Sequence, residues 1–86
     1  MAEVTVTLRY FAGAAAAAGA EEERVRLPVG STVADALRDA GDRRGAALAR
    51  VIAASSVLVD GVHQRVGAAG LTDGVTLDVL PPFAGG

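Results

Sequence analysis

The residues of this chain that could do chemistry are the last six, Pro81-Pro82-Phe83-Ala84-Gly85-Gly86. Two consecutive prolines cannot continue a central strand, because neither has a backbone N–H and each fixes φ. The strand-like run Val75–Leu80 is therefore predicted to end at Leu80, and the residues after it to project from the fold as a flexible tail. Gly86 would then present a carboxylate whose carbonyl carbon is open to attack from either face, because glycine has no Cβ.

A tail of this length has a long reach. Extended, it spans about 20 Å, which is enough to place Gly86 inside a pocket of another protein while the folded body stays outside. A free α-carboxyl group is ionised at neutral pH, and a carboxylate is a poor electrophile. Any acyl transfer at Gly86 must therefore begin with activation of the carboxylate.

Composition excludes most chemistry on side chains. The chain has 86 residues, enough for one core, and we expect one domain over residues 1–80 followed by the tail over residues 81–86. It has no cysteine, which excludes disulfides, thiolate metal sites and a thiol or persulfide carried on a side chain. It also has no lysine, which excludes a Walker phosphate loop and a Schiff base. We therefore expect this chain to bind no metal and no cofactor, and any ATP to be bound by another protein.

Charge and hydropathy narrow the expected partners. The net charge is −2, the arginines are scattered, and the few aromatic residues form no stacking platform, so binding to nucleic acid is not expected. No apolar stretch approaches the roughly 18 residues that cross a bilayer, and the amino end lacks a basic region followed by an apolar one. A cytoplasmic protein without a membrane partner is therefore expected.

The first third of the chain predicts a hairpin with a long connection. Val4–Tyr10 alternates apolar and polar residues, as a half-buried strand does. Residues 11–20 contain an alanine run that favours a short helix. Residues 21–27 predict a second strand that Pro28 stops, with Glu21-Glu22-Glu23 as its solvated edge.

The middle of the chain predicts two helices and a second hairpin. Thr32 and Asp35 fit a capping box, the apolar stripe that follows runs to Ala40, and Gly41 is the expected terminator. A polar break over residues 41–44 would separate this helix from a second one over residues 45–54. Asp60-Gly61 predicts a tight turn between short strands, and residues 71–74 turn the chain into the last strand.

This order of elements predicts an α+β fold. A helical crossover between two hairpin-like halves lets the first and last strands lie parallel at the centre of the sheet. The arrangement is the ubiquitin-like β-grasp: a mixed sheet of four to five strands, helices packed on one face, and a protruding C-terminal tail.

The carboxyl-terminal residues also carry a resemblance to a known family. Leu71-Thr72-Asp73-Gly74-Val75-Thr76-Leu77-Asp78-Val79-Leu80, followed by Pro81-Pro82-Phe83-Ala84-Gly85-Gly86, resembles the C-terminal signature of the MoaD/ThiS sulfur carriers. Leu8-Arg9-Tyr10-Phe11-Ala12 is similar to the first strand of the MoaD branch, the small subunits of molybdopterin synthase. A Gly-Gly end alone is common among ubiquitin-like proteins. Together with the Pro-Pro-X-Ala segment, the Asp-Gly turn and the length, it is fairly specific.

The resemblance implies a reaction at Gly86. A MoeB-like enzyme would bind ATP and adenylate Gly86, and a sulfur donor protein would replace AMP to leave a thiocarboxylate. The sulfur would then pass to cyclic pyranopterin monophosphate, a precursor of molybdopterin, on a MoaE-like large subunit. The chain would be the sulfur-donating small subunit of a heterotetramer of two small and two large subunits, and would not be catalytic on its own.

The tail residues before Gly86 have expected roles as well. Gly85 and Ala84 would enter the partner together with Gly86. Apolar side chains on or beside a solvated tail have no role in the core, so they are predicted to anchor the partner. The predicted partner contacts are Leu80, Pro81, Pro82 and Phe83.

Other readings stay open, and other candidate residues are weaker. A carrier for thiamine or cysteine synthesis would use the same activation, and a ubiquitin-like modifier or an inert interaction module could share the Gly-Gly end. His63 is the one histidine and is expected to be an exposed strand residue. Asp73, Asp78 and Asp35 could be read as general bases, but turn formation, solvent exposure and helix capping, respectively, explain them.

Overall fold

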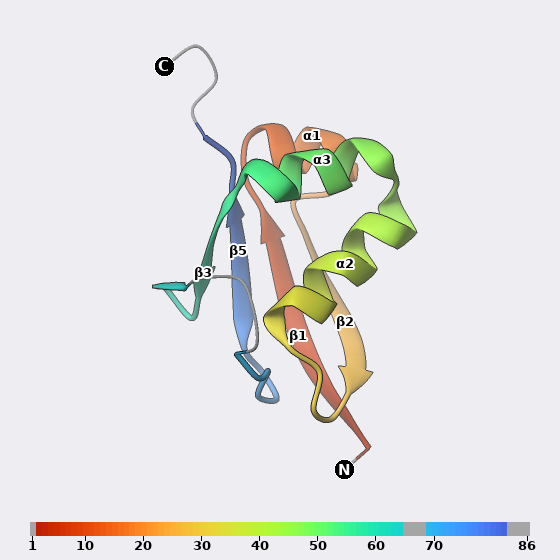
Figure 1. Ribbon diagram of the computed structural model, residues 1–86, viewed down its shortest axis with the longest axis vertical. Coiled ribbons are helices and arrows are strands. Elements are labelled where there is room, and N and C mark those ends of the chain that lie inside the picture. Colours follow the sequence, from red (N-terminus) through yellow and green to blue (C-terminus); the bar gives the residue numbers. More distant parts are fainter. Residues whose placement is uncertain (1, 65–68, 83–86) are drawn as a thin grey trace.

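The computed structural model describes residues 2–64 and 69–82, which form one five-stranded sheet with helices on one face (Figure 1). The order of strands in the sheet is β2-β1-β5-β3-β4. The strands are β1 (Glu3–Tyr10), β2 (Glu22–Pro28), β3 (Ser56–Val59), β4 (Val62–Gln64) and β5 (Thr76–Leu80). The helices are α1 (Gly13–Ala18), α2 (Val33–Arg44) and α3 (Ala46–Ala54). The α+β, ubiquitin-like β-grasp prediction is thus confirmed.

The first and last strands, β1 and β5, pair with each other at the centre of the sheet. β1 pairs antiparallel with β2 on one side and parallel with β5 on the other, and β5 pairs antiparallel with β3. The parallel pairing requires a crossover, which the helices supply on one face (Figure 1). The predicted hairpin at Asp60-Gly61 is confirmed, with φ of 47° at Asp60 and 82° at Gly61, as a two-residue turn of this sequence requires.

The core follows the alternation of the sequence. The inward residues of β1 and β5 are buried, and Leu8 and Leu77, which are register partners, have no exposed surface. α2 adds the predicted stripe to this core, and α3 adds Leu48, which is fully buried. In the described part of the chain, no polar or charged residue is fully buried. The buried residues of β1, α2 and β5 are Val4, Val6, Leu8, Tyr10, Val33, Ala36, Leu37, Ala40, Gly41, Leu77 and Val79.

α2 begins as predicted but ends later than predicted. The Thr32 hydroxyl accepts a hydrogen bond from the Asp35 N–H at 3.1 Å, and Asp35 accepts one from the Thr32 N–H at 2.9 Å, so both halves of the capping box are present. The prediction that Gly41 ends the helix is wrong, and so is the polar break over residues 41–44. The helix continues to Arg44 and stops at Gly45, whose φ is 114°.

The helices α1 and α3 pack together at the end of the sheet where β1 and β5 finish (Figure 1). The predicted short helix of the alanine run is α1, which buries Ala14 and Ala18, four residues apart. α3 agrees with its prediction within one residue. In the part of the chain that the structure describes, no helix combines the length and apolar character that a membrane span requires.

The acidic run Glu21-Glu22-Glu23 at the start of β2 is not simply a solvated edge, because Glu23 has several partners. Its carboxylate accepts hydrogen bonds from the Tyr10 hydroxyl at 2.6 Å, from Arg44 Nε at 2.7 Å and from Arg43 at 3.0 Å. Burial alone would raise the pKa of Glu23, but the hydrogen bonds from Arg44, Tyr10 and Arg43 outweigh it and lower that pKa to about 2. Arg44 also donates to the Ala18 carbonyl at 2.7 Å. Glu23 therefore ties β2 to β1 and to the end of α2, and Arg44 connects this group of residues to the end of α1.

Candidate functional site at the root of the tail

The strand that leads to the tail is fixed at its beginning by two aspartates. Asp73 accepts a hydrogen bond from the Thr5 N–H at 2.8 Å, and the Gly74 N–H donates to the Thr5 carbonyl at 2.7 Å. Asp60 accepts a bond from the Thr76 N–H at 2.9 Å, and its own N–H donates to the Thr76 carbonyl at 2.8 Å. The start of β5 is thus bonded to β1 on one side and to the β3–β4 turn on the other.

The far end of β5 is held in the same way. The Phe11 N–H donates to the Val79 carbonyl at 3.2 Å, which extends the pairing with β1 beyond Tyr10. Ser56 is the register partner of Leu80 on β3. β5 ends at Leu80, as the two prolines predicted. We call Leu80–Pro82 the tail root.

The tail root lies between two hollows in the surface. The first, here called the sheet-side hollow, has a volume of about 580 Å³ and is lined by Leu80, Pro81 and Pro82 together with Phe11, Ala12, Gly13, Ala54, Ser56 and His63. The second, the helix-side hollow, has a volume of about 570 Å³ and is lined by Pro81 and Pro82 together with Gly13, Ala17, Ala47, Arg50, Val51 and Ala54. Both are lined mainly by apolar groups, so each offers an apolar binding surface beside the tail root.

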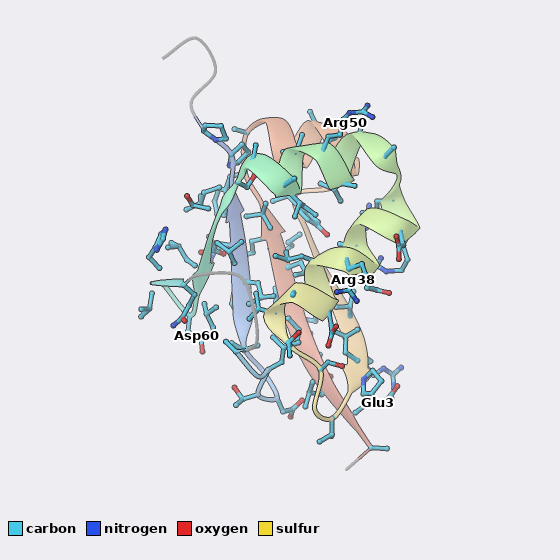
Figure 2. All side chains as sticks on the ribbon, viewed as in Figure 1. Glu3, Arg38, Arg50 and Asp60 are labelled. Atoms are coloured by element: carbon cyan, nitrogen blue, oxygen red, sulfur yellow. The ribbon has the colours of Figure 1, made fainter. Side chains whose placement is uncertain are left out.

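One basic residue, Arg50, lies beside the tail root. Arg50 borders the helix-side hollow and His63 borders the sheet-side hollow, and no acidic residue of the described chain lines either of them. Figure 2 shows Arg50 at the end of the molecule where β5 leads into the prolines, whereas Glu3 and Asp60 lie towards the other end. A protein that seats on the tail root would therefore meet an apolar surface with Arg50 at its edge.

The described residues include the first part of the predicted site, Leu80 to Pro82. Leu80 and Pro81 are half-buried and Pro82 is exposed, and the structure brings these three together with the apolar residues of the two hollows. Phe83, Ala84, Gly85 and Gly86 lie outside the described residues. The roles assigned to all seven residues, and the division of the chain at residue 80, stay predictions.

The other candidate residues fall where the sequence placed them, with one correction. Asp35 caps α2, Asp73 holds a turn, and His63 is exposed on β4. Hydrogen bonds from Thr32 lower the pKa of Asp35. Within residues 2–64 and 69–82, no group of three or more His, Asp or Glu side chains could hold a metal ion.

Asp78 is the correction, since it is not solvent-exposed as predicted. Its side chain is only 14% exposed, and its Oδ1 lies 3.4 Å from Nε of Arg9, its register partner on β1. Sequence analysis placed Arg9 on the polar face but gave it no role. The guanidinium of Arg9 also lies over the ring of Phe11, with 5.2 Å between its Cζ and the ring centroid. The available signal was the spacing of Arg9 on the strand and Phe11 directly after it, two positions apart.

The backbone at Ala12 is strained. Ala12 precedes α1, lines the sheet-side hollow and has φ of 49° and ψ of −125°, a combination that a residue with a Cβ rarely adopts. The turn it makes redirects the chain from β1 into α1, next to the tail root.

The comparisons with known proteins concern nearly the whole chain. Residues 8–86 match the ThiS family. No curated protein matches the chain significantly. Among solved structures, small archaeal modifier protein 1 of Haloferax volcanii is 30% identical with a TM-score of 0.81, over 95% of this chain and 99% of that one.

Two further solved structures are named as parts of a molybdopterin converting factor. A protein of Pyrococcus furiosus, assigned as its subunit 1, is 27% identical with a TM-score of 0.82, over 93% of this chain and 99% of that one. A chain of the Helicobacter pylori complex of subunits 1 and 2 is 19% identical with a TM-score of 0.65, over 96% of this chain and 100% of that one, and shows the fold alone.

Proposed function

This chain belongs to the ThiS family, and from that membership and the geometry of the tail root we propose that it is a sulfur carrier whose reacting group is the carboxylate of Gly86. The observation that carries the proposal is the position of β5. It is hydrogen-bonded to β1 and β3 in the middle of the sheet and leads directly into the prolines. A strand held from both sides gives a rigid base for the residues that follow it.

The proposed reaction has two steps at Gly86. A carboxylate oxygen first attacks the α-phosphorus of ATP bound by a MoeB-like enzyme, and pyrophosphate leaves. A sulfide equivalent from a sulfur donor protein then attacks the carbonyl carbon, and AMP leaves with the oxygen that attacked phosphorus. The product is a thiocarboxylate, a nucleophile at the end of the tail. This chain supplies the acyl group and the docking surface, and the partner supplies the nucleotide site, because a chain without lysine or cysteine has no side chain suited to these steps.

The pathway that we propose for this sulfur is molybdopterin synthesis. The likeness to the Pyrococcus furiosus protein supports it, together with the Pro-Pro-Phe-Ala-Gly-Gly ending. A MoaE-like large subunit would accept the loaded tail, in a heterotetramer of two small and two large subunits. The Helicobacter pylori protein is itself one of two subunits in a complex, so the proposal is tested by asking whether a large subunit copurifies with this chain. A carrier for thiamine or cysteine synthesis would be loaded identically, so the large subunit that copurifies with this chain decides among them. The cytoplasmic location of the protein stays a prediction.

A second candidate function is that of a protein modifier. It is favoured by the 30% identity to small archaeal modifier protein 1, whose name states that role. A modifier would use the same adenylate, but an amine of a target protein would replace AMP, and the product would be a conjugate.

Intact mass measurement tests the proposed function. The chain is incubated with the adenylating enzyme, ATP and a sulfur source, and we expect a gain equal to the exchange of one oxygen for sulfur. A chain that lacks Gly86 should show no gain. Gly70→Ala is a matched control, because a Cβ at Gly70 would meet nothing within 4 Å and the residue lies away from the tail root. An unmodified wild-type chain under conditions that load a known carrier would overturn the proposal.

Affinity for the large subunit tests the docking role of the tail. We propose that Phe83 and the tail root anchor the partner, because an apolar side chain that a partner buries contributes more than a solvated one. Phe83→Asp should weaken binding at least tenfold, whereas Phe83→Leu should weaken it much less. Equal affinity of wild type and Phe83→Asp would remove Phe83 from the interface.

A further inference from the structure

Three side chains on the face of the sheet away from the helices connect the centre of the sheet to the tail root. Asp78 on β5 and Arg9 on β1 are register partners, and Arg9 Nε lies 3.4 Å from Asp78 Oδ1. Arg9 Cζ lies 5.2 Å from the centroid of the Phe11 ring. Phe11 in turn lines the sheet-side hollow together with Leu80, Pro81 and Pro82. The order of contact is therefore Asp78, Arg9, Phe11, tail root.

Asp78 is the fixed end of this series of contacts. Asp78 Oδ1 has almost no contact with solvent and makes no hydrogen bond with any residue of the described chain, so the guanidinium of Arg9 is its compensating charge. A carboxylate oxygen that is shielded from solvent attracts a nearby cation more than a solvated one does, so it favours the location of the guanidinium beside it. Arg9 itself is half-exposed and could otherwise take many rotamers. Asp78 therefore restricts Arg9 to the position from which it covers Phe11.

The fixed arginine restricts Phe11 in the same way. A guanidinium over an aromatic ring is attracted to the face of that ring, which favours one ring rotamer over the others. The ring forms part of the wall against which the prolines leave the sheet. Proline has a fixed φ, so the direction of Pro81 and Pro82 depends on ψ of the preceding residues and on what they pack against.

We propose that Arg9 is a positioning residue that, through Phe11, sets the direction in which the tail leaves the sheet. The inference rests on the proposed function, because the direction matters only if Gly86 must enter a partner. A tail that samples fewer directions is more often competent to enter, and the apparent dissociation constant falls in proportion to the competent fraction. Arg9 thus contributes to recognition by the activating enzyme without touching the reacting atoms.

A spin label tests the direction without any enzyme. The chain has no cysteine, so Ala84→Cys gives a single attachment site in the full chain. Relaxation enhancement is measured on the amides of His63 and Ser56, beside the sheet-side hollow, and of Ala47 and Ala17, beside the helix-side hollow. In the labelled chain without a further substitution, we expect the relaxation enhancement to be larger for one group of amides than for the other. In Arg9→Gln, the ratio of the two enhancements should move at least twofold towards one. Phe11→Leu should resemble Arg9→Gln, and Arg9→Lys should restore most of the unevenness.

The matched control is Arg24→Gln. Arg24 is exposed on the same face, where it is the register partner of Thr7 on β1. It should leave the ratio unchanged. The proposal is overturned if Arg9→Gln keeps the ratio of the unchanged chain, or if Arg24→Gln alters it equally. Retained thermal unfolding temperature and amide dispersion show that each variant folds, and Phe11→Leu and Arg9→Lys decide the question if Arg9→Gln does not fold.

Loading kinetics give the second readout. Arg9→Gln should raise the KM of the adenylating enzyme for this chain about three- to tenfold and leave kcat unchanged, since a bound tail is aligned by the enzyme. A redistributed label with an unchanged KM would overturn the contribution to recognition. If the wild-type chain is not adenylated at all, the proposed function fails, while the spin-label result still decides whether Arg9 directs the tail.

Discussion

Gly41 and Ala49 hold α2 and α3 in direct contact. A Cβ built on Gly41 would lie 3.1 Å from Ala49 Cβ and 3.3 Å from its Cα, closer than such atoms normally approach. Gly41 therefore lies inside α2 because the next helix needs its space, although a glycine in a helix interior is less favourable than alanine by about 1 kcal/mol. The helix pair and the end of the sheet that it covers depend on this contact.

A larger residue at position 41 should destabilise the domain. Gly41→Leu should lower the free energy of unfolding by about 1–3 kcal/mol, because the added side chain must displace α3. Gly41→Ala should have a smaller effect, since the gain in helix propensity offsets part of the overlap. Urea denaturation measures both. Gly13→Ala is the control, because a Cβ at this other helical glycine meets nothing within 4 Å; equal effects at the two positions would refute the packing explanation.

Replacement of Glu23 should remove part of the pH dependence of stability. Three donors lower the pKa of Glu23 to about 2 in the fold, from an ordinary value of 4.5, so its stabilising contribution is complete above about pH 5 and disappears as the pH falls towards 2. Glu23→Gln should therefore be less stable than wild type at pH 7, by about 1–3 kcal/mol. The difference should narrow between pH 5 and pH 2 in urea titrations.

Glu21→Gln serves as the control for this titration, since Glu21 is exposed. Its stability should follow that of wild type across the same pH range. A constant difference between Glu23→Gln and wild type from pH 7 to pH 2 would show that the carboxylate charge contributes nothing and that the lost stability is a packing effect.

Relief of the strained backbone at Ala12 should stabilise the chain. A residue held in such a region costs about 1–3 kcal/mol, whereas the extra freedom that glycine gives the unfolded chain costs about 0.4–1 kcal/mol. The cost of strain exceeds the cost of that freedom, so Ala12→Gly should raise the free energy of unfolding by about 1 kcal/mol. Ala16→Gly, at an exposed position inside α1, should lower it by about that amount. A loss of stability in Ala12→Gly would show that the fold tolerates this φ without strain.

Alternation and turn chemistry in the sequence were enough to predict the sheet. The inward residues of β1 and β5, the Asp60-Gly61 turn and the stop at Leu80 all depend on near neighbours along the chain. The capping box of α2 is equally local, because Thr32 and Asp35 are three residues apart. Such features depend on residues that are close together in the sequence, so they can be predicted without knowledge of the fold.

The errors all concern residues whose role is set by partners on another helix or strand. Gly41 resembles a helix terminator until Ala49 packs against it, and Glu23 resembles a solvated edge until α2 brings Arg43 and Arg44 beside it. Asp78 resembled an exposed strand residue, but the parallel pairing of β5 with β1 sets it beside Arg9. A single sequence contains no signal for such pairs unless the register is known.

Removal of Gly86 should separate stability from loading. β5 ends at Leu80, and residues beyond a last strand contribute few buried contacts. The chain without Gly86 should therefore unfold within about 1 °C of the wild-type temperature in calorimetry, a range expected for changes well below 1 kcal/mol in a domain of this size. The same protein should gain no sulfur in the mass assay. A parallel loss of thermal stability and loading would contradict the separation of scaffold and tail.

The absence of lysine distinguishes the carrier from the modifier in a further assay. A modifier joins Gly86 to an amine of another protein, and because this chain has no lysine, no second copy could be attached to a side-chain amine of the first. Conjugates would therefore contain no chain of copies joined through side chains of this protein, and digestion would never yield a branched peptide on such a side chain. For the carrier that we propose, a tagged chain purified from its own cells should instead run as one species under denaturing conditions and react with a thiol-alkylating reagent, although it has no cysteine. Removal of Gly86 should abolish that reaction. Higher bands that disappear on the same deletion, together with no alkylation of the free chain, would favour the modifier.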